Sequence, residues 1–115
     1  MATAVKHRDM AATFRALGDP VRRAMVEHLS NGDATVNDLA ALFPITVQAV
    51  SQHIKVLENA GVVTRLRIGQ TRPVSLRPAS LTETADWIAA RTRQVESRYQ
   101  RLDDLVAELQ QGTSP

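Results

Sequence analysis

The sequence predicts a mainly α-helical fold with one small β-hairpin, and three observations support this class. Apolar residues recur every three or four positions over most of the chain, the period of amphipathic helices. Over residues 62–77 the period changes to two, as expected for two short strands and a turn. The chain has only two Phe, one Tyr and one Trp, so its core must be aliphatic, which favours helices over a β-sandwich.

Length and composition narrow the possible classes of protein. A chain of 115 residues is expected to form one domain, residues 1–115, that buries about 65% of its unfolded surface by itself. The absence of cysteine excludes disulfides, thiolate metal sites and thiol redox chemistry. Residues 1–14 lack the apolar core of a secretory signal, and no run approaches the ~20 apolar residues of a membrane span. We therefore expect a soluble, cytoplasmic protein that makes no membrane contact.

Two helices are expected at the start of the chain. The first covers about residues 9–17 and places Phe14 on its apolar face. The second begins after Asp19, a typical N-cap residue, with Pro20 at its first position, and stops at Asn31-Gly32.

Residues 35–60 are expected to form a helix-turn-helix. Thr35 can cap its first helix, and Pro44 disfavours helical geometry at the residue before it. Thr46 can cap the second helix, which ends where Gly61 can adopt a left-handed conformation. A turn of only two or three residues is expected between the helices.

The second helix of this pair has two different faces. Four residues at steps of three and four form an apolar stripe that is expected to be core: Val47, Val50, Ile54 and Leu57. Polar side chains of the kind that hydrogen-bond to planar groups occupy the other face: Gln48, Ser51, Gln52 and Lys55.

A positively charged hairpin is expected over about residues 62–77. Gly69-Gln70 supplies the turn, and Pro73, which lacks an N–H, suggests an edge strand at that point. No acidic residue occurs between Glu58 and Glu83, whereas that interval contains Arg65, Arg67, Arg72 and Arg77. The hairpin is therefore basic although the net charge of the chain is only +2.

The last helix is expected over about residues 81–110, with apolar residues at mostly three- and four-residue spacing. A helix of this length is too long to be covered by so small a domain. We therefore expect a homodimer, with an interface made by Met10, Phe14, Trp87, Ile88, Val95, Tyr99, Leu102, Val106 and Leu109.

The order of helix, turn, helix and basic hairpin is that of a dimeric winged helix-turn-helix, with five helices and a two-stranded wing. Glutamine can pair with adenine in the major groove, hydroxyl groups can bond to bases or phosphates, and Lys or Arg can neutralise phosphate charge. The candidate contacts to double-stranded DNA are Thr46, Gln48, Ala49, Ser51, Gln52, Lys55, Arg65, Arg67, Gln70, Thr71 and Arg72.

Four segments resemble the ArsR-type transcriptional repressors in order and spacing: "LGDPVRRAMVEHL", "DATVNDLAALF", "VSQHIKVLENAGVV" and "RIGQTRPVSL". The resemblance covers roughly residues 14–76, and its most specific motif is Ser-x-His-Ile-Lys-x-Leu at Ser51–Leu57. It implies a dimeric repressor that binds a palindromic operator and releases it when an effector binds. In that family the first and last helices form the dimer interface.

Metal-sensing members of that family carry a Cys-x-Cys motif where this chain has Thr35 and Asn37, and others use histidines on the last helix. No histidine follows His53 here, so neither a metal site of the family's usual kind nor a resident cofactor is expected. The last helix resembles a metal-independent, cysteine-free branch with Ala-x-Trp and Arg-Leu-Asp motifs, which implies no particular effector.

Several alternatives remain open at this stage. A winged helix can bind protein instead of DNA, and His7, Asp9 and His28 could contribute to an unconventional metal site. His53 fits a packing role or a phosphate contact, and Trp87 fits an interface anchor or the wall of a ligand pocket. The sequence contains no glycine-rich phosphate loop and no set of residues typical of nucleophilic catalysis, so an enzyme is not expected.

Overall fold

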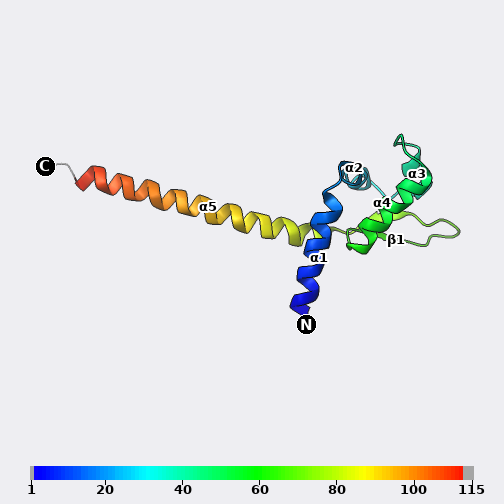
Figure 1. Ribbon diagram of the computed structural model, residues 1–115, viewed down its shortest axis with the longest axis horizontal. Helices are drawn as coiled ribbons and strands as arrows, with labels where there is room; N and C mark the ends of the chain where they lie inside the picture. The colour runs from blue at the N-terminus through cyan, green and yellow to red at the C-terminus, as the bar shows by residue number, and fades with distance from the viewer. Residues whose placement is uncertain (1, 113–115) are drawn as a thin grey trace. The chain divides into compact units, whose positions relative to one another are not determined.

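The computed structural model describes residues 2–112, with side chains from Met10 onward, and its chain divides into two compact units, Met1–Thr84 and Ala85–Pro115. The elements in chain order (Figure 1) are α1 (Ala2–Leu17), α2 (Pro20–Leu29), α3 (Val36–Ala40), α4 (Val47–Asn59), β1 (Val63–Arg65), β2 (Val74–Leu76) and α5 (Pro78–Gly112). These five helices and the antiparallel strand pair confirm the predicted fold class.

The junction between α1 and α2 is closed by side chains of the second helix. The Asp19 carboxylate accepts a hydrogen bond from the Arg22 backbone N–H at 3.0 Å, as predicted for an N-cap. The Arg22 guanidinium donates in turn to the carbonyl oxygens of Ala16 at 2.6 Å and Arg15 at 3.2 Å. Because the last carbonyls of a helix have no partner within it, these bonds complete the C-terminus of α1.

The turn between α3 and α4 is longer than predicted. Thr35 and Asp38 form a reciprocal capping box at the start of α3, with bonds of 3.0 and 3.1 Å. The helix then ends at Ala40, so residues 41–46 connect it to α4 and the expectation of two or three residues is wrong. Pro44 disfavours helical geometry at Phe43, but α3 ends three residues before that position, so the proline alone does not set the length of the turn.

Both ends of α4 are capped by local interactions that the sequence predicts. The Thr46 hydroxyl accepts from the Ala49 N–H at 3.0 Å. At the other end Gly61 has a φ of +78°, and the N–H groups of Gly61 and Val62 donate to the carbonyls of Glu58 and Leu57. This pair of bonds is a Schellman motif, which satisfies two of the last carbonyls of the helix.

The core of the first unit forms around the buried face of α4. Val50, Ile54 and Leu57 have no exposed surface, and the largest side chains buried beside them include Met25 and Leu39. Val47, which the stripe pattern assigned to the core, is 50% exposed. It is the first residue of the helix, and this end of the apolar stripe is not covered by the elements that pack against α4.

The two strands form a short hairpin anchored on both sides. Val63 pairs with Leu76, and the backbones of Ala34 and Val74 exchange two hydrogen bonds, of 2.7 and 3.2 Å, on the far side of β2. The sequence indicates an open edge at Pro73 but does not predict this bridge one residue later. The bridge attaches the wing to the segment that leads into α3.

We predict that replacing Asp19 with Ala destabilises the protein at neutral pH and that this difference disappears in acid. The backbone N–H of Arg22 lowers the pKa of the Asp19 carboxyl from its ordinary value, so its stabilisation is present above that value and is lost as the pH falls through the folded-state pKa. Urea unfolding of both proteins from neutral to acidic pH measures this.

Asp33→Ala is the matched control, because Asp33 is an exposed carboxyl in the loop after α2. It should change the unfolding midpoint little at any pH. A destabilisation by Asp19→Ala that persists undiminished in strong acid would contradict the charge-dependent part of the cap.

Candidate nucleic-acid interface

The face of α4 opposite the core is polar and open to solvent over its first turns. Gln48, Gln52 and Lys55 are exposed, whereas Ser51 and Ala49 are half-buried at the margin of the core. Thr46 is exposed, but its side-chain oxygen already accepts the capping hydrogen bond. The two glutamines lie one helical turn apart on this surface, where their amides can reach a flat partner.

His53 lies on the side of α4 that faces α2. Its Nδ1 is 3.3 Å from Nη1 of Arg22, and since a guanidinium can only donate, the imidazole nitrogen is the acceptor. This bond joins α4 to the arginine that closes α1. The half-buried ring and this bond favour the packing role among the two considered for His53.

The wing ends in a tight two-residue turn. Ile68 and Thr71 exchange backbone hydrogen bonds of 3.1 and 3.0 Å across Gly69-Gln70, and Gly69 has a φ of +63° while Gln70 does not have a positive φ. A positive φ at the first central residue alone is the pattern of a type II′ hairpin turn, which favours glycine there. The predicted tip is thus confirmed, and the exposed residues Arg67 and Arg72 flank it.

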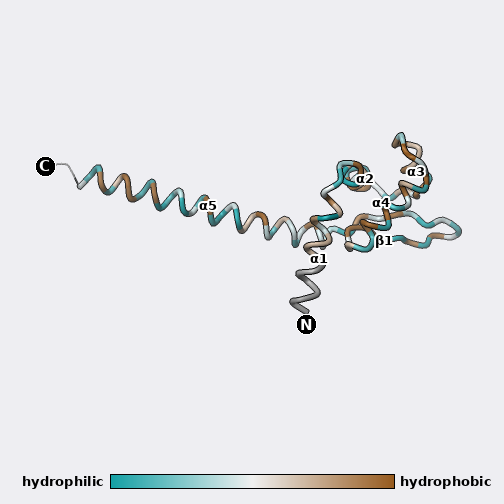
Figure 2. Tube along the Cα trace, in the orientation of Figure 1, coloured by the Kyte–Doolittle hydropathy of each residue, from teal (hydrophilic) through white to brown (hydrophobic). Residues whose placement is uncertain are grey.

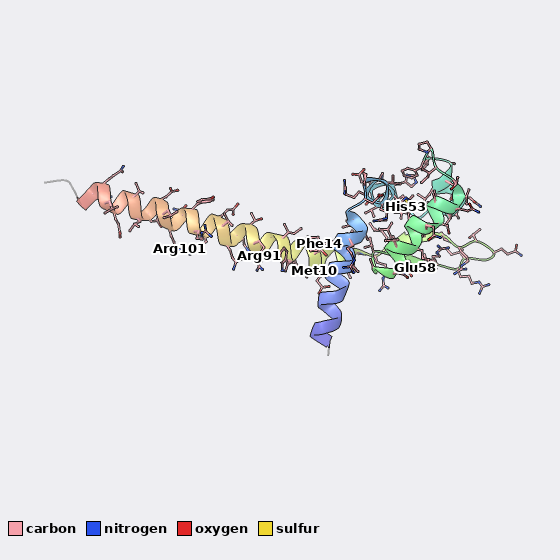
Figure 3. The ribbon with its side chains drawn as sticks, in the orientation of Figure 1. Met10, Phe14, His53, Glu58, Arg91 and Arg101 are labelled. Atoms are coloured by element: carbon pink, nitrogen blue, oxygen red, sulfur yellow. The ribbon has the colours of Figure 1, made fainter. Side chains whose placement is uncertain are left out.

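Arg65 differs from the arginines near the tip. Its Nε lies 3.6 Å from Oε1 of Glu58, near the C-terminal end of α4 (Figure 3), and this nitrogen is buried without a hydrogen-bond partner within the described residues. The ion pair attaches the base of the wing to α4. Arg65 is therefore less free to contact a ligand than Arg67 or Arg72.

The wing and the start of α3 enclose a shallow recess on the same unit. It is lined by Thr35, Val36, Asn37, Asp38, Arg65, Gln70, Thr71 and Arg72. The recess brings four of the predicted contact residues of the wing beside the helix-turn-helix: Arg65, Gln70, Thr71 and Arg72. The Thr71 hydroxyl donates to the Ile68 carbonyl at 2.7 Å, so it also supports the turn.

The sequence interpretation overlooked one candidate contact. Val47 stands beside Gln48 at the exposed start of α4 and offers an apolar surface of the kind that meets a thymine methyl group. The apolar spacing assigned Val47 to the core. Its position directly after the N-cap nevertheless indicates that it lies at the edge of the packed surface. Its exposure was decided by where the core ends.

The predicted dimer residues of α5 are all exposed in the single chain. The exposed fractions of Ile88, Val95, Tyr99 and Leu109 are 47%, 42%, 61% and 64%, and those of Trp87, Leu102 and Val106 are 44%, 55% and 52%. Apolar and polar bands alternate along this helix (Figure 2). On α1, Phe14 is 42% exposed and Met10 is half-buried.

The side chain of Trp87 interacts with its own helix. The guanidinium carbon of Arg91, one turn later, lies 5.0 Å from the centre of the indole ring, a cation–π arrangement.

Potential metal ligands are scattered over the part of the chain that the structure describes. Among its side chains, no group of three or more His, Asp or Glu residues could hold a metal ion. The side chains of His7 and Asp9 lie outside that set, and His28 is exposed. None of the described helices has a stretch both long and apolar enough to cross a bilayer.

Comparison with known proteins identifies relatives of one kind. A helix-turn-helix domain model matches residues 17–65. The chain is 34% identical over 79 residues to the transcriptional repressor SdpR of Bacillus subtilis, covering 69% of this chain and 88% of SdpR. It is 40% identical over 75 residues to the HTH-type transcriptional regulator Rv2034 of Mycobacterium tuberculosis. The match covers 65% of this chain and 70% of Rv2034.

A solved structure shows the same similarity at the level of the fold. The crystal structure of an ArsR family transcriptional regulator matches with a TM-score of 0.71 and 32% identity, covering 78% of this chain and 93% of that one.

We predict that the two parts of this surface contribute differently to DNA binding. Gln48→Ala/Gln52→Ala should cost about 1–3 kcal/mol for each base edge that is no longer bound, and should affect a cognate site most. Arg67→Ala/Arg72→Ala should weaken binding to most sequences and flatten the log–log salt dependence by up to ~0.9 for each phosphate that is no longer neutralised. Titrations on operator and random DNA at several salt concentrations measure both effects.

Asn59→Ala, at the exposed C-terminal end of α4, controls for the glutamine pair, and Arg93→Ala on α5 controls for the arginine pair. Equal reductions in affinity for operator and random DNA with the glutamine pair would contradict base reading by α4. An unchanged salt slope for the arginine pair would contradict phosphate binding by the wing.

Proposed function

The chain belongs to the ArsR family of winged helix-turn-helix transcriptional regulators, and we propose that it represses transcription by binding a palindromic operator as a homodimer. The observation that carries this proposal is the division of α4 into a fully buried face at Val50, Ile54 and Leu57 and an exposed face with Gln48, Gln52 and Lys55. Such a helix is held rigidly while its polar side chains remain available to base edges.

In this proposal the start of α4 enters the major groove. The amides of Gln48 and Gln52 meet base edges, and Lys55, one turn further on, neutralises a phosphate. The same end of α4 would also present Thr46, Ala49 and Ser51 to the groove. Ala49 and the overlooked Val47 would offer small apolar contacts. The exposed polar face also favours DNA over a protein partner, which would require an apolar patch at these positions.

The arginines of the wing supply charge without reading sequence. Arg67 and Arg72 flank a turn fixed by Gly69, so both guanidinium groups extend from a defined position toward the DNA backbone or minor groove. Gln70 and Thr71 lie at the tip between them. The ion pair of Arg65 with Glu58 positions the wing on α4, so Arg65 contributes mainly by fixing the angle of the hairpin.

A second subunit follows from the exposed apolar side chains of α5. Val95, Leu102, Val106 and Leu109 would all contact water in a monomer, at exposed fractions between 42% and 64%. An apolar surface of this extent is typical of an interaction site. A homodimer also matches a palindromic operator, since two copies of α4 can then read two half-sites.

Release of the operator by a thiophilic metal is not part of this proposal. Thr35 and Asn37 occupy the positions of the Cys-x-Cys motif, and the Thr35 hydroxyl is engaged in the capping box of α3. Oxygen ligands of this kind bind soft metals weakly. Electrophoretic mobility shift on the DNA upstream of the protein's own coding sequence tests the central proposal, and failure to bind any such fragment would contradict it.

We predict that Leu102→Glu/Leu109→Glu yields a monomer or an unfolded chain, because burying unpaired carboxylates in an apolar interface is unfavourable. Sedimentation velocity and circular dichroism measure the two outcomes. Gln94→Glu/Gln111→Glu adds the same charge to the same helix outside the stripe and should leave the oligomeric state unchanged. A stable dimer of the leucine variant would exclude this interface.

We also predict that equimolar arsenite or cadmium leaves the affinity for DNA unchanged, since the chain has no cysteine and no soft ligand at the matching positions. Fluorescence anisotropy with labelled operator, with and without each ion, measures this. Thr35→Cys/Asn37→Cys is an informative comparison because it restores two thiols at those positions. Release of DNA from the natural chain would show that a different metal site exists.

A further inference from the structure

We propose that Ile68, at the tip of the wing, makes the hairpin select A·T over G·C base pairs in the minor groove of the operator. This inference rests on the proposed function and adds a specificity-determining residue to it. It is carried by the exposure of the Ile68 side chain, by the rigidity of its backbone and by the chemistry of the minor groove.

Ile68 is the most exposed large apolar residue among the described residues of the first unit. Its exposed fraction is 61%, against 55% for Leu42 and 50% for Val47. A single exposed apolar side chain is common on a protein surface and needs no explanation there. Ile68, however, stands next to Arg67 at the end of a basic hairpin, where turns usually carry polar residues. Its place on the wing, more than its exposure, indicates a contact with DNA.

The backbone of Ile68 is held in place by three hydrogen bonds. Its N–H donates to the Thr71 carbonyl at 3.1 Å, and its carbonyl accepts from the Thr71 N–H at 3.0 Å and from the Thr71 hydroxyl at 2.7 Å. None of these bonds uses the isoleucine side chain, so the side chain can be changed without removing the turn. A contact made by Ile68 is therefore preorganised.

The tip of the hairpin has one charged face and one uncharged face. Ile68 pairs with Thr71 in the same register as β1 and β2, so these two side chains lie on one face. Because side chains alternate along a strand, Arg67 and Arg72 lie on the other face. A hairpin that enters a groove tip first therefore presents cations to one wall and an apolar side chain to the other.

The size of this tip suits the minor groove. Paired strands lie about 4.8 Å apart and the minor groove of B-DNA is about 6 Å wide, so only the turn and the residues beside it can enter. Arg67 and Arg72 then lie beside phosphates, as in the proposed function. Ile68, one residue closer to the turn than Arg67, extends to the base edges on the floor of the groove.

The floor of the minor groove differs between the two kinds of base pair by one group. Both kinds present hydrogen-bond acceptors, and only G·C adds a donor, the amino group of guanine. The exposed amide of Gln70 can donate to the acceptors, but isoleucine cannot accept from the amino group. Burying that donor against an apolar side chain leaves it without a partner, whereas adenine presents only a C–H at the same place. Ile68 therefore disfavours G·C without bonding to any base.

The first experiment maps the base pairs that lie beneath the tip. The natural chain contains no cysteine, so Gln70→Cys carries an iron–EDTA label at a single site. On the upstream fragment that the protein shifts, the label should cut both strands with the stagger that cleavage from the minor groove produces. Cleavage from the major groove, or no cleavage by a labelled protein that still shifts the fragment, would overturn the proposal.

Modified base pairs at the mapped positions then test the chemistry. Duplexes that differ only there carry A·T, G·C, inosine·C, which lacks the amino group, or diaminopurine·T, which gains it. G·C and diaminopurine·T should bind roughly five- to thirtyfold more weakly than A·T and inosine·C, because a buried donor is left unsatisfied. If inosine·C binds as weakly as G·C, the preference does not arise in the minor groove and the proposal is overturned.

Ile68→Thr isolates the side chain, because it keeps the β-branch and the backbone bonds and adds a hydroxyl that can accept from the guanine amino group. The ratio of the affinities for A·T and G·C duplexes should fall to about twofold or less. The salt dependence should stay unchanged, since Arg67 and Arg72 remain. Val56→Thr, which introduces the same hydroxyl at a 39% exposed residue of α4, is the control that should preserve the ratio.

The failures of the two proposals are distinguishable. If Ile68→Thr disfavours G·C as strongly as the natural chain does, the role of Ile68 is overturned and the proposed function stays intact. A protein that shifts no upstream fragment would overturn the proposed function, and with it the role of Ile68.

Discussion

The burial of one face of α4 is the constraint on which the first unit depends. Val50, Ile54 and Leu57 are completely removed from solvent, and the other helices and the hairpin pack around them. The surrounding core is aliphatic and has no large aromatic side chain at its centre, so it depends on close packing of small side chains. Any displacement of α4 would open cavities on several sides at once.

That constraint also explains how a single helix can serve both packing and recognition. A base-reading side chain is useful only if its backbone does not move, and the caps at Thr46 and Gly61 fix both ends of α4. The Arg22–His53 bond and the Arg65–Glu58 ion pair connect the same helix to the α1–α2 junction and to the wing. The polar contacts thus orient the proposed interface, while the apolar contacts stabilise it.

The second unit is governed by a different requirement. Its helix has no packed neighbour of its own among the described residues of that unit, and its apolar residues are half or more exposed at Tyr99, Leu102 and Leu109. Such a surface is unfavourable in water, and the proposed homodimer would remove it. In the proposed function, dimer formation and operator recognition are linked, because a palindromic operator is read by the α4 helices of both copies.

The sequence by itself determined the type and order of the elements, the caps at Asp19 and Thr46, the turn at Gly69, and the polar face of α4. These features depend on local chemistry: hydrogen-bonding side chains at helix starts, glycine at positive φ, and apolar spacing along one segment. Only the tertiary structure decided that Val47 is exposed, because a periodic stripe does not show where the packed core ends. It also decided the Ala34–Val74 bridge and the Arg65–Glu58 ion pair, since contacts between distant segments depend on how those segments pack and leave no local pattern in the sequence.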